Sequence, residues 1–201
     1  MEASEVIDIA LAIDAGRLPT EHEQALADAL EQALPWLAGT PQVGVHPMRL
    51  ARGGGRALLS GRTRLTLRVP RERAVDVAAL AGAELPLAGG SLRLGTAQAR
   101  ELLPWGTLYA HCVAADGSDD ELAFLQAMQT ELQALGVTGR VICGLPRFDL
   151  NGVRRGYALM VDQLSEADSV TLQHHGLGAG RRIGLGVFVP HKSAAAVGAA
   201  P

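Results

Sequence analysis

The chain of 201 residues has few aromatic side chains, with only two Trp, two Tyr and three Phe residues. Proteins that bind single-stranded RNA on an open β-sheet usually stack the bases on exposed aromatic rings. The shortage of rings therefore disfavours base stacking as the main way in which this chain would bind a nucleic acid.

Cysteines are also scarce, since only Cys112 and Cys143 occur. They are far apart and each lies in an apolar, strand-like run, which predicts buried free thiols and argues against a disulfide framework or a zinc site. No apolar run approaches the roughly 20 residues that a membrane-spanning helix needs, and the acidic first residues do not resemble a signal peptide. We therefore expect a soluble, cytoplasmic protein.

Lysine is nearly absent, because Lys192 accompanies seventeen arginines in a chain with a formal net charge of −3. Residues 1–35 carry eight acids and one arginine, whereas residues 49–73 carry eight arginines and one glutamate. Such a basic segment is typical of a nucleic-acid contact, and arginine can bind phosphate in a bidentate manner. A solvated basic face or a G+C-rich genome would give the same bias, so the segment favours nucleic-acid binding without proving it.

Two similar passages follow one another along the chain. Each has an apolar strand, a helix with apolar residues at helical spacing, two further strand-like runs, a second helix and a last strand. The predicted ranges are 6–13, 20–39, 43–49, 64–69, 71–80 and 92–94, then 108–115, 118–136, 140–145, 156–161, 165–174 and 183–189. This order, β-α-β-β-α-β twice, predicts an α+β protein made of two tandem ferredoxin-like units.

Boundaries and helix starts follow from the same reading. We expect residues 1–97 to form the N-terminal unit, residues 106–192 the C-terminal unit and the alanine-rich residues 193–201 a flexible tail. Thr20-Glu-His-Glu23 and Ser118-Asp-Asp-Glu121 both match the capping box that often starts a helix. The glycine- and arginine-rich connector at 51–62 is predicted to be a hairpin tip that faces a ligand.

The end of the second passage, residues 176–192, reads GLGAGRRIGLGVFVPHK and holds five glycines and two adjacent arginines. Glycines let a backbone approach a bulky anion, while amides and arginines supply donors and charge. The segment is not a nucleotide-binding loop, because the third glycine of GxGxxG falls on Arg181 or Ile183 and no Gly-Lys-Ser/Thr occurs. It predicts a clamp for an RNA backbone. The expected RNA contacts are Arg52, Arg56, Arg62, Arg64, Arg154, Arg155, Gly178, Gly180, Arg181, Arg182 and Lys192.

These features resemble the CRISPR-associated endoribonucleases that cut precursor CRISPR RNA within each repeat, and most closely the compact subgroup of myxobacterial-type type I systems. The resemblance covers nearly all of residues 5–192. It rests on the glycine-rich end, on Leu-Pro-Thr-Glu-His at 18–22, on Gly-Val-His-Pro at 44–47 and on the paired units. It implies attack of a ribose 2′-hydroxyl on the adjacent phosphate, without metal or cofactor, to give a 2′,3′-cyclic phosphate and a 5′-hydroxyl.

The resemblance also implies partners and residue roles. The protein is expected to stay on the cleaved CRISPR repeat stem-loop and to join the other Cas subunits of a type I surveillance complex. The family carries its catalytic residue on the first helix of the first unit, and His22 matches that place. The absence of clustered carboxylates and of His/Cys ligand spacing agrees with a reaction that needs no metal.

Cleavage by cyclisation needs one group to take the 2′ proton and another to protonate the leaving oxygen, and histidine suits both tasks near neutral pH. His22 is predicted to lie in the first turn after a Thr20 cap, where the positive helix end favours a neutral imidazole although Glu21 and Glu23 oppose it. His46, in the next strand, is the second candidate, and packing in the core would explain it equally well. Lys192 could stabilise the transition-state charge.

Two other functions remain open at this point. A non-catalytic subunit that holds the CRISPR RNA handle would have the same fold and loops without turnover. A small-molecule regulator with ferredoxin-like units is disfavoured, because a small site has no use for so long a track of arginines.

Overall fold

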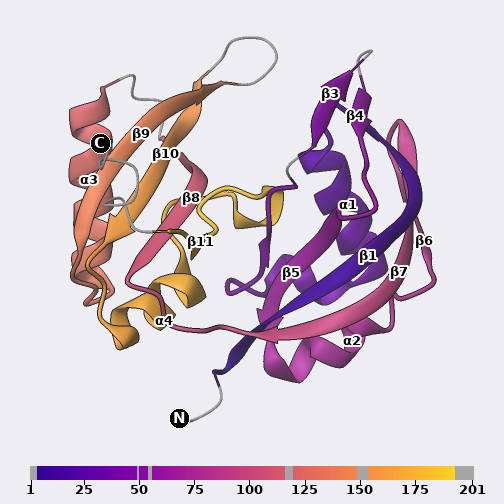
Figure 1. The fold of residues 1–201 in the computed structure, drawn as a ribbon, viewed down its shortest axis with the longest axis horizontal. Helices are drawn as coiled ribbons and strands as arrows, with labels where there is room; N and C mark the ends of the chain where they lie inside the picture. Colours follow the sequence, from indigo (N-terminus) through magenta and orange to yellow (C-terminus); the bar gives the residue numbers. More distant parts are fainter. Residues whose placement is uncertain (1–3, 49, 54–55, 116–119, 149–153, 193–201) are drawn as a thin grey trace, which may run out of the picture. The chain divides into compact units, whose positions relative to one another are not determined.

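The computed structural model describes residues 4–48, 50–53, 56–115, 120–148 and 154–192, without the side chains of residues 51–53, 56–58 and 154. The chain forms two compact units (Figure 1), one comprising Met1–Leu102 with Arg182–Gly184 and the other Leu103–Arg181 with Leu185–Pro201. The predicted tail at 193–201 lies outside the described residues. Among the residues described, no helix is long and apolar enough to cross a membrane.

The first unit contains one antiparallel sheet in the strand order β2-β5-β1-β7. These are the four strands of the predicted β-α-β-β-α-β passage, and their order is that of a ferredoxin-like unit. The elements are β1 (Val6–Pro19), α1 (Glu23–Ala33), η1 (Pro35–Gly39), β2 (Gly44–Val45), β3 (Ala51–Gly53), β4 (Arg56–Leu58), β5 (Arg64–Pro70), η2 (Arg71–Arg73), α2 (Ala74–Ala78), β6 (Glu84–Leu87) and β7 (Gly90–Glu101).

Three parts of the first unit differ from the prediction. The connector at 51–62 is not a plain hairpin tip, because β3 and β4 pair there and β4 joins the far end of β1. The strand expected at 43–49 ends at Val45 because Pro47 has no amide hydrogen to continue a ladder. The last strand is longer than expected and forms a β6–β7 hairpin, in which Gly89 takes a φ of +83° at the turn.

The second unit repeats the topology with the strand order β11-β8-β10-β9. It contains β8 (Thr107–Ala114), α3 (Glu121–Ala134), β9 (Arg140–Phe148), β10 (Arg154–Asp162), α4 (Glu166–His175), η3 (Arg181–Ile183) and β11 (Val189–Pro190). The strand predicted at 183–189 was wrong, since only Val189 and Pro190 pair with β8. The preceding glycines have positive φ values, which a strand does not allow. The prediction of two tandem ferredoxin-like units is confirmed.

Neither predicted capping box forms as expected. Helix α1 begins at Glu23, so the N-cap is His22 and not Thr20, and no side chain caps it. Helix α3 is capped by Asp120, whose carboxylate accepts the amide of Leu122, while Ser118 lies outside the described residues. A cap depends on which residue leaves the helical conformation first, and several Ser, Thr and Asp residues in one short segment compete for that position.

Each unit has its own hydrophobic core. In the first, the residues at helical spacing, Leu26, Leu30, Leu34 and Leu37, are all buried against the sheet, as predicted. In the second, Phe124, Met128 and Leu132 of α3 are buried, whereas Leu122 at the start of the helix is 63% exposed. Both cysteines are free thiols, Cys112 buried and Cys143 half-buried, and burial raises the pKa of the Cys143 thiol to about 11.

Candidate active site

His22 occupies the turn between β1 and α1. Its carbonyl oxygen accepts the amide of Leu26 at 2.8 Å, so the backbone already belongs to the helix. The side chain is only 6% exposed, and among the described residues its Nδ1 has no hydrogen-bond partner. A buried polar atom without a partner destabilises a fold by about 1–3 kcal/mol, so such atoms are rare outside sites that bind or react. His22 therefore has the environment of a functional residue.

His46 lies immediately after β2 and its position is fixed from two sides. Its amide donates to the carbonyl of Thr66 at 2.9 Å, which continues the pairing of β2 with β5 for one residue. Its ring atom Nε2 lies 3.2 Å from Oδ2 of Asp8 on β1. The imidazole is therefore held by the sheet and is not a loose side chain on a loop.

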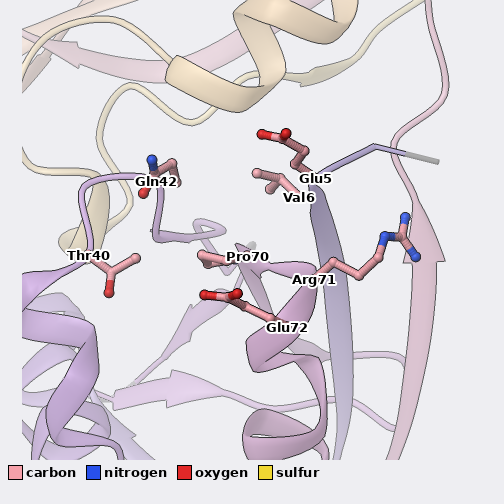
Figure 2. A pocket seen from close by; sticks show the side chains of 7 residues that line it. All are labelled: Glu5, Val6, Thr40, Gln42, Pro70, Arg71 and Glu72. Carbon is pink, nitrogen blue, oxygen red and sulfur yellow. The ribbon is translucent and has the colours of Figure 1, made fainter. Parts of the chain in front are cut away.

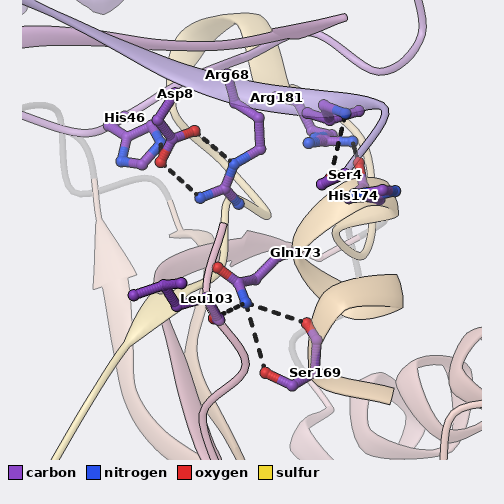
Figure 3. Close-up of polar contacts among 10 residues, drawn as sticks. Ser4, Asp8, His46, Arg68, Leu103, Ser169, Gln173, His174 and Arg181 are labelled. Atoms are coloured by element: carbon purple, nitrogen blue, oxygen red, sulfur yellow. Dashed lines mark hydrogen bonds and ion pairs between the residues drawn. The ribbon is translucent and has the colours of Figure 1, made fainter. Parts of the chain in front are cut away.

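Asp8 lies beside His46 and is bound on its other side by Arg68 (Figure 3). Asp8 and Arg68 are directly opposed on β1 and β5, and Arg68 donates from Nε to Oδ1 at 2.8 Å and from Nη2 to Oδ2 at 3.0 Å. The side chain of Arg68 is wholly buried. Burial alone would raise the pKa of the Asp8 carboxyl, but hydrogen bonds and charge attraction from His46 and Arg68 outweigh it and hold that pKa far below its ordinary value. Asp8 therefore stays ionised well below the pH at which a carboxyl group ordinarily gains its proton.

The sequence analysis missed Asp8 and Arg68. Both interrupt otherwise apolar strands, VIDIALAI and RLTLRVP. An ionisable residue within a buried strand needs a partner of opposite charge, so the two interruptions were a signal for an ion pair.

His22 and His46 line the same crevice in the first unit. Its volume is about 10 Å³, which is room for one water molecule at most. Glu23, Leu26, Val45, Pro47, Met48 and the segment Arg182–Gly184 complete the lining. The two histidines singled out in the sequence are thus neighbours, although 24 positions separate them along the chain. No group of three His, Cys, Asp or Glu residues that could hold a metal ion occurs in the described parts of the chain.

Arg182 borders this crevice and is the one arginine of the glycine-rich segment that the structure assigns to the first unit. Its guanidinium pairs with Glu31 of α1 and is half exposed. Exposed ion pairs contribute at most about 1 kcal/mol. A phosphate could therefore replace Glu31 as the partner of Arg182 with only a small cost in free energy.

The other predicted RNA contacts fall into three groups. Arg62 and Arg64 are exposed, and Arg64 donates to the carbonyls of Gly61 and Thr63 at 2.9 and 2.8 Å. Arg155 is half-buried and Lys192 is exposed. Arg52, Arg56 and Arg154 lie on β3, β4 and β10, and their side chains are outside the described part of the structure.

Within the glycine-rich segment, two predicted contacts already have protein partners. The amide of Gly178 donates to Oε2 of Glu131 at 2.8 Å. Arg181 donates from Nη1 to the carbonyls of His174 and His175 at 2.6 and 2.7 Å, and so it caps the end of α4. Gly180 has a φ of +87° and forms part of the turn between Gly178 and Arg181.

The glycine-rich segment is held by close backbone approach. Gly186 has a φ of +64°, and a Cβ atom placed there would lie 2.0 Å from the carbonyl oxygen of Leu177. We expect Gly186→Ala to lower the free energy of unfolding by about 1–3 kcal/mol, because it adds both strain and overlap. Urea denaturation measures the change. Gly106→Ala, where a Cβ would meet nothing within 4 Å, is the matched control and should be close to neutral.

A larger pocket lies elsewhere in the first unit (Figure 2). It has a volume of about 700 Å³ and is lined by Glu5, Val6, Thr40, Gln42, Pro70, Arg71 and Glu72. The guanidinium of Arg71 is paired with Glu101, which leaves the carboxylates of Glu5 and Glu72 as the charges facing this pocket. The pocket is therefore a poor place for an RNA backbone, and it holds none of the predicted contacts.

Comparison with known proteins agrees with the fold and with the resemblance. The family model described as Cas6 Crispr matches residues 7–193. A CRISPR-associated endonuclease Cas6 of Myxococcus xanthus (strain DK1622) is 33% identical over 193 residues, which cover 95% of this chain and 84% of that protein. The relationship to the CRISPR-associated endoribonucleases expected from the histidine and glycine motifs is thereby confirmed.

Solved structures show the same fold at much lower identity. A CRISPR associated protein Cas6 has a TM-score of 0.63 at 11% identity, covering 94% of this chain and 100% of that one. A Cas6-related protein from Pyrococcus furiosus has a TM-score of 0.61 at 12% identity, covering 92% and 98%. A RAMP protein binding different RNA substrates has a TM-score of 0.53 at 14% identity, covering 91% and 98%. The fold, the paired histidines and the match over almost the whole chain lead to one conclusion: the chain belongs to the Cas6 family of CRISPR-associated proteins.

Proposed function

We propose that this chain is the endoribonuclease that cuts precursor CRISPR RNA within its repeats. One observation carries the proposal: His22 and His46 line one crevice, and Nδ1 of His22 is buried there with no partner among the described residues. Two imidazoles that line the same crevice can serve as base and acid for attack of a 2′-hydroxyl on the neighbouring phosphate. The endonuclease activity named for the Myxococcus xanthus relative supports this assignment.

The proposed reaction is a transesterification. His22 takes the proton of the ribose 2′-hydroxyl as that oxygen attacks phosphorus. His46, protonated beside Asp8, gives its proton to the 5′ oxygen as the bond from phosphorus to that oxygen breaks. The products are a 2′,3′-cyclic phosphate and a 5′-hydroxyl. Both electron pairs stay within the substrate, so the two histidines only exchange protons with it.

Binding of the repeat is assigned to the arginines and to the glycine-rich segment. Exposed Arg62 and Arg64 supply charge near the β3–β4 hairpin, and Arg182 can exchange Glu31 for a phosphate at the crevice. The remaining predicted contacts, with Lys192, would lie along the same RNA. We place the protein in the cytoplasm, bound after cleavage to the repeat stem-loop and to the other Cas subunits of a type I surveillance complex.

The test is cleavage of the cognate repeat RNA by the purified full-length chain in the presence of EDTA. We expect a single cut that leaves a cyclic phosphate, detected by its resistance to a ligase that needs a 3′-hydroxyl. A 2′-deoxy nucleotide at the cut position removes the nucleophile and should stop cleavage while the RNA still binds. Continued cutting of the deoxy substrate would show that the proposed chemistry is wrong.

A second candidate function is a non-catalytic subunit that holds the RNA handle. It is favoured by the small volume of the crevice, about 10 Å³, which a phosphodiester cannot enter without movement of the lining side chains. Tight binding of the repeat without any cleavage, at every pH between about 5 and 9 where histidines change charge, would support this alternative.

A further inference from the structure

We infer that Asp8, fixed by Arg68, is the positioning residue of His46 and determines which of its ring nitrogens delivers the proton. The inference rests on the proposed function, because it gives His46 the part of the acid. It goes further by naming two residues of the first sheet that do not contact the RNA themselves.

Arg68 by itself is sufficient to fix the carboxylate of Asp8, without any contribution from His46. Two hydrogen bonds from Arg68, at 2.8 and 3.0 Å, hold both carboxylate oxygens, and the two residues are opposed in the β1–β5 ladder. Oδ2 is shared with His46 at 3.2 Å. A carboxylate held in this way has one orientation, so the ring that it contacts has one orientation as well.

Stability alone does not explain the ion pair. Arg68 is wholly buried, and replacement of such a pair by apolar residues of similar size is often neutral or stabilising. On the same face of the sheet, Val6 and Ala10 of β1 flank Asp8 and are also buried, so this face packs apolar side chains as well. The pair has a third partner, His46, and we assign its purpose to that contact.

Two consequences follow for His46. Nε2 of His46 faces the Asp8 carboxylate as an ion pair at 3.2 Å, so in the protonated ring we expect the hydrogen on Nε2 to stay beside Asp8 and proton transfer to RNA to be directed to Nδ1. The negative charge also favours the protonated ring, although Arg68 offsets part of that effect. The other ionisable groups around the crevice are His22, Glu23 and Arg182. The arrangement is that of an oriented general acid.

The experiment compares Asp8→Asn with the wild type in single-turnover cleavage across pH. We expect cleavage to slow by about ten- to a hundredfold with RNA affinity unchanged, and the alkaline limb of the pH–rate profile to move to lower pH by about one unit. Glu101→Gln is the matched control, because it removes a carboxylate of β7 in the same sheet from an exposed ion pair with Arg71 of η2. Its rate and its profile should equal those of the wild type.

Asp8→Asn leaves Arg68 buried without its counter-charge and could unfold the protein. The double variant Asp8→Leu/Arg68→Met removes both charges and restores an apolar pair. The double variant should fold and bind RNA. Its cleavage should be as slow as that of Asp8→Asn, and the alkaline limb of its pH–rate profile should lie at the same lower pH. A folded double variant with the rate and the pH profile of the wild type would overturn the inference.

A second readout separates this inference from the proposed function. NMR titration of the His46 ring in the RNA-free protein needs no activity. We expect the titration midpoint to fall and the hydrogen on Nε2 to exchange faster in Asp8→Asn. An unchanged titration overturns the positioning role even if the wild type cleaves RNA. A changed titration in a protein that never cleaves supports the positioning role and overturns the proposed activity.

Discussion

Replacing His22 with asparagine is expected to stop RNA cleavage without weakening the fold. The base in a proton transfer contributes about 10²- to 10⁴-fold to the rate, so the single-turnover rate should fall by that factor. His22 makes no capping hydrogen bond and leaves Nδ1 unpartnered among the described residues, so asparagine removes no cap and no hydrogen bond from that atom. The free energy of unfolding should therefore change by less than about 1 kcal/mol.

This combination distinguishes a catalytic histidine from a structural one. Cleavage is followed with an excess of enzyme over the repeat RNA, affinity by filter binding and stability by urea denaturation. His175→Asn, at the exposed end of α4, is the control and should change none of the three. If His22→Asn cleaves at the wild-type rate, the assignment of His22 is wrong, and if it unfolds, the residue serves the fold.

Arg68→Met is expected to have the largest effect on stability. Removal of one partner from a buried ion pair typically lowers the free energy of unfolding by about 3–5 kcal/mol, because the remaining charge stays buried without compensation. Here the remaining charge is the Asp8 carboxylate, which would keep His46 as its one partner among the described residues. Urea denaturation at pH 7 measures the loss. Arg73→Met, which breaks the exposed pair with Asp76, is the matched control and should change stability by less than about 1 kcal/mol.

The loss of stability in Arg68→Met should depend on pH, and the direction of the change follows from the pKa of Asp8. The pKa of Asp8 is lower in the folded protein than in the unfolded chain, so its contribution to stability is present above the unfolded pKa of about 3.9 and is lost as pH falls toward the folded value. In Arg68→Met, His46 is the one described residue that still opposes the effect of burial on Asp8, and the pKa of Asp8 should rise. The stability difference between wild type and variant should therefore shrink as the pH is lowered from 7 to about 2, with most of the change below about pH 4. A difference that is constant over this range would contradict the account of the pair.

Local patterns in the chain were sufficient for the architecture. The alternation of strand-like and helical runs depends on side-chain periodicity, which each segment carries by itself. Leu26, Leu30 and Leu34 show the period of a helix that buries one face, and the structure buries all of them. The two histidines were also visible, because His22 precedes an apolar helix and His46 follows an apolar strand. The glycine-rich end was recognised as a loop, although a strand was wrongly expected at 183–189.

The tertiary structure decided what these residues can do. Asp8, His46 and Arg68 are 38 and 22 positions apart along the chain, and only the pairing of β1 with β5 and of β5 with β2 brings them together. The N-cap of α1 is His22 and not the predicted Thr20, because the end of β1 determines where the helix can begin. Periodicity therefore determined the two βαββαβ units and pointed to the histidines. Contacts between strands distant in sequence created the ion pair, the shared crevice and the unpartnered nitrogen, since their energies depend on neighbours that no local segment contains.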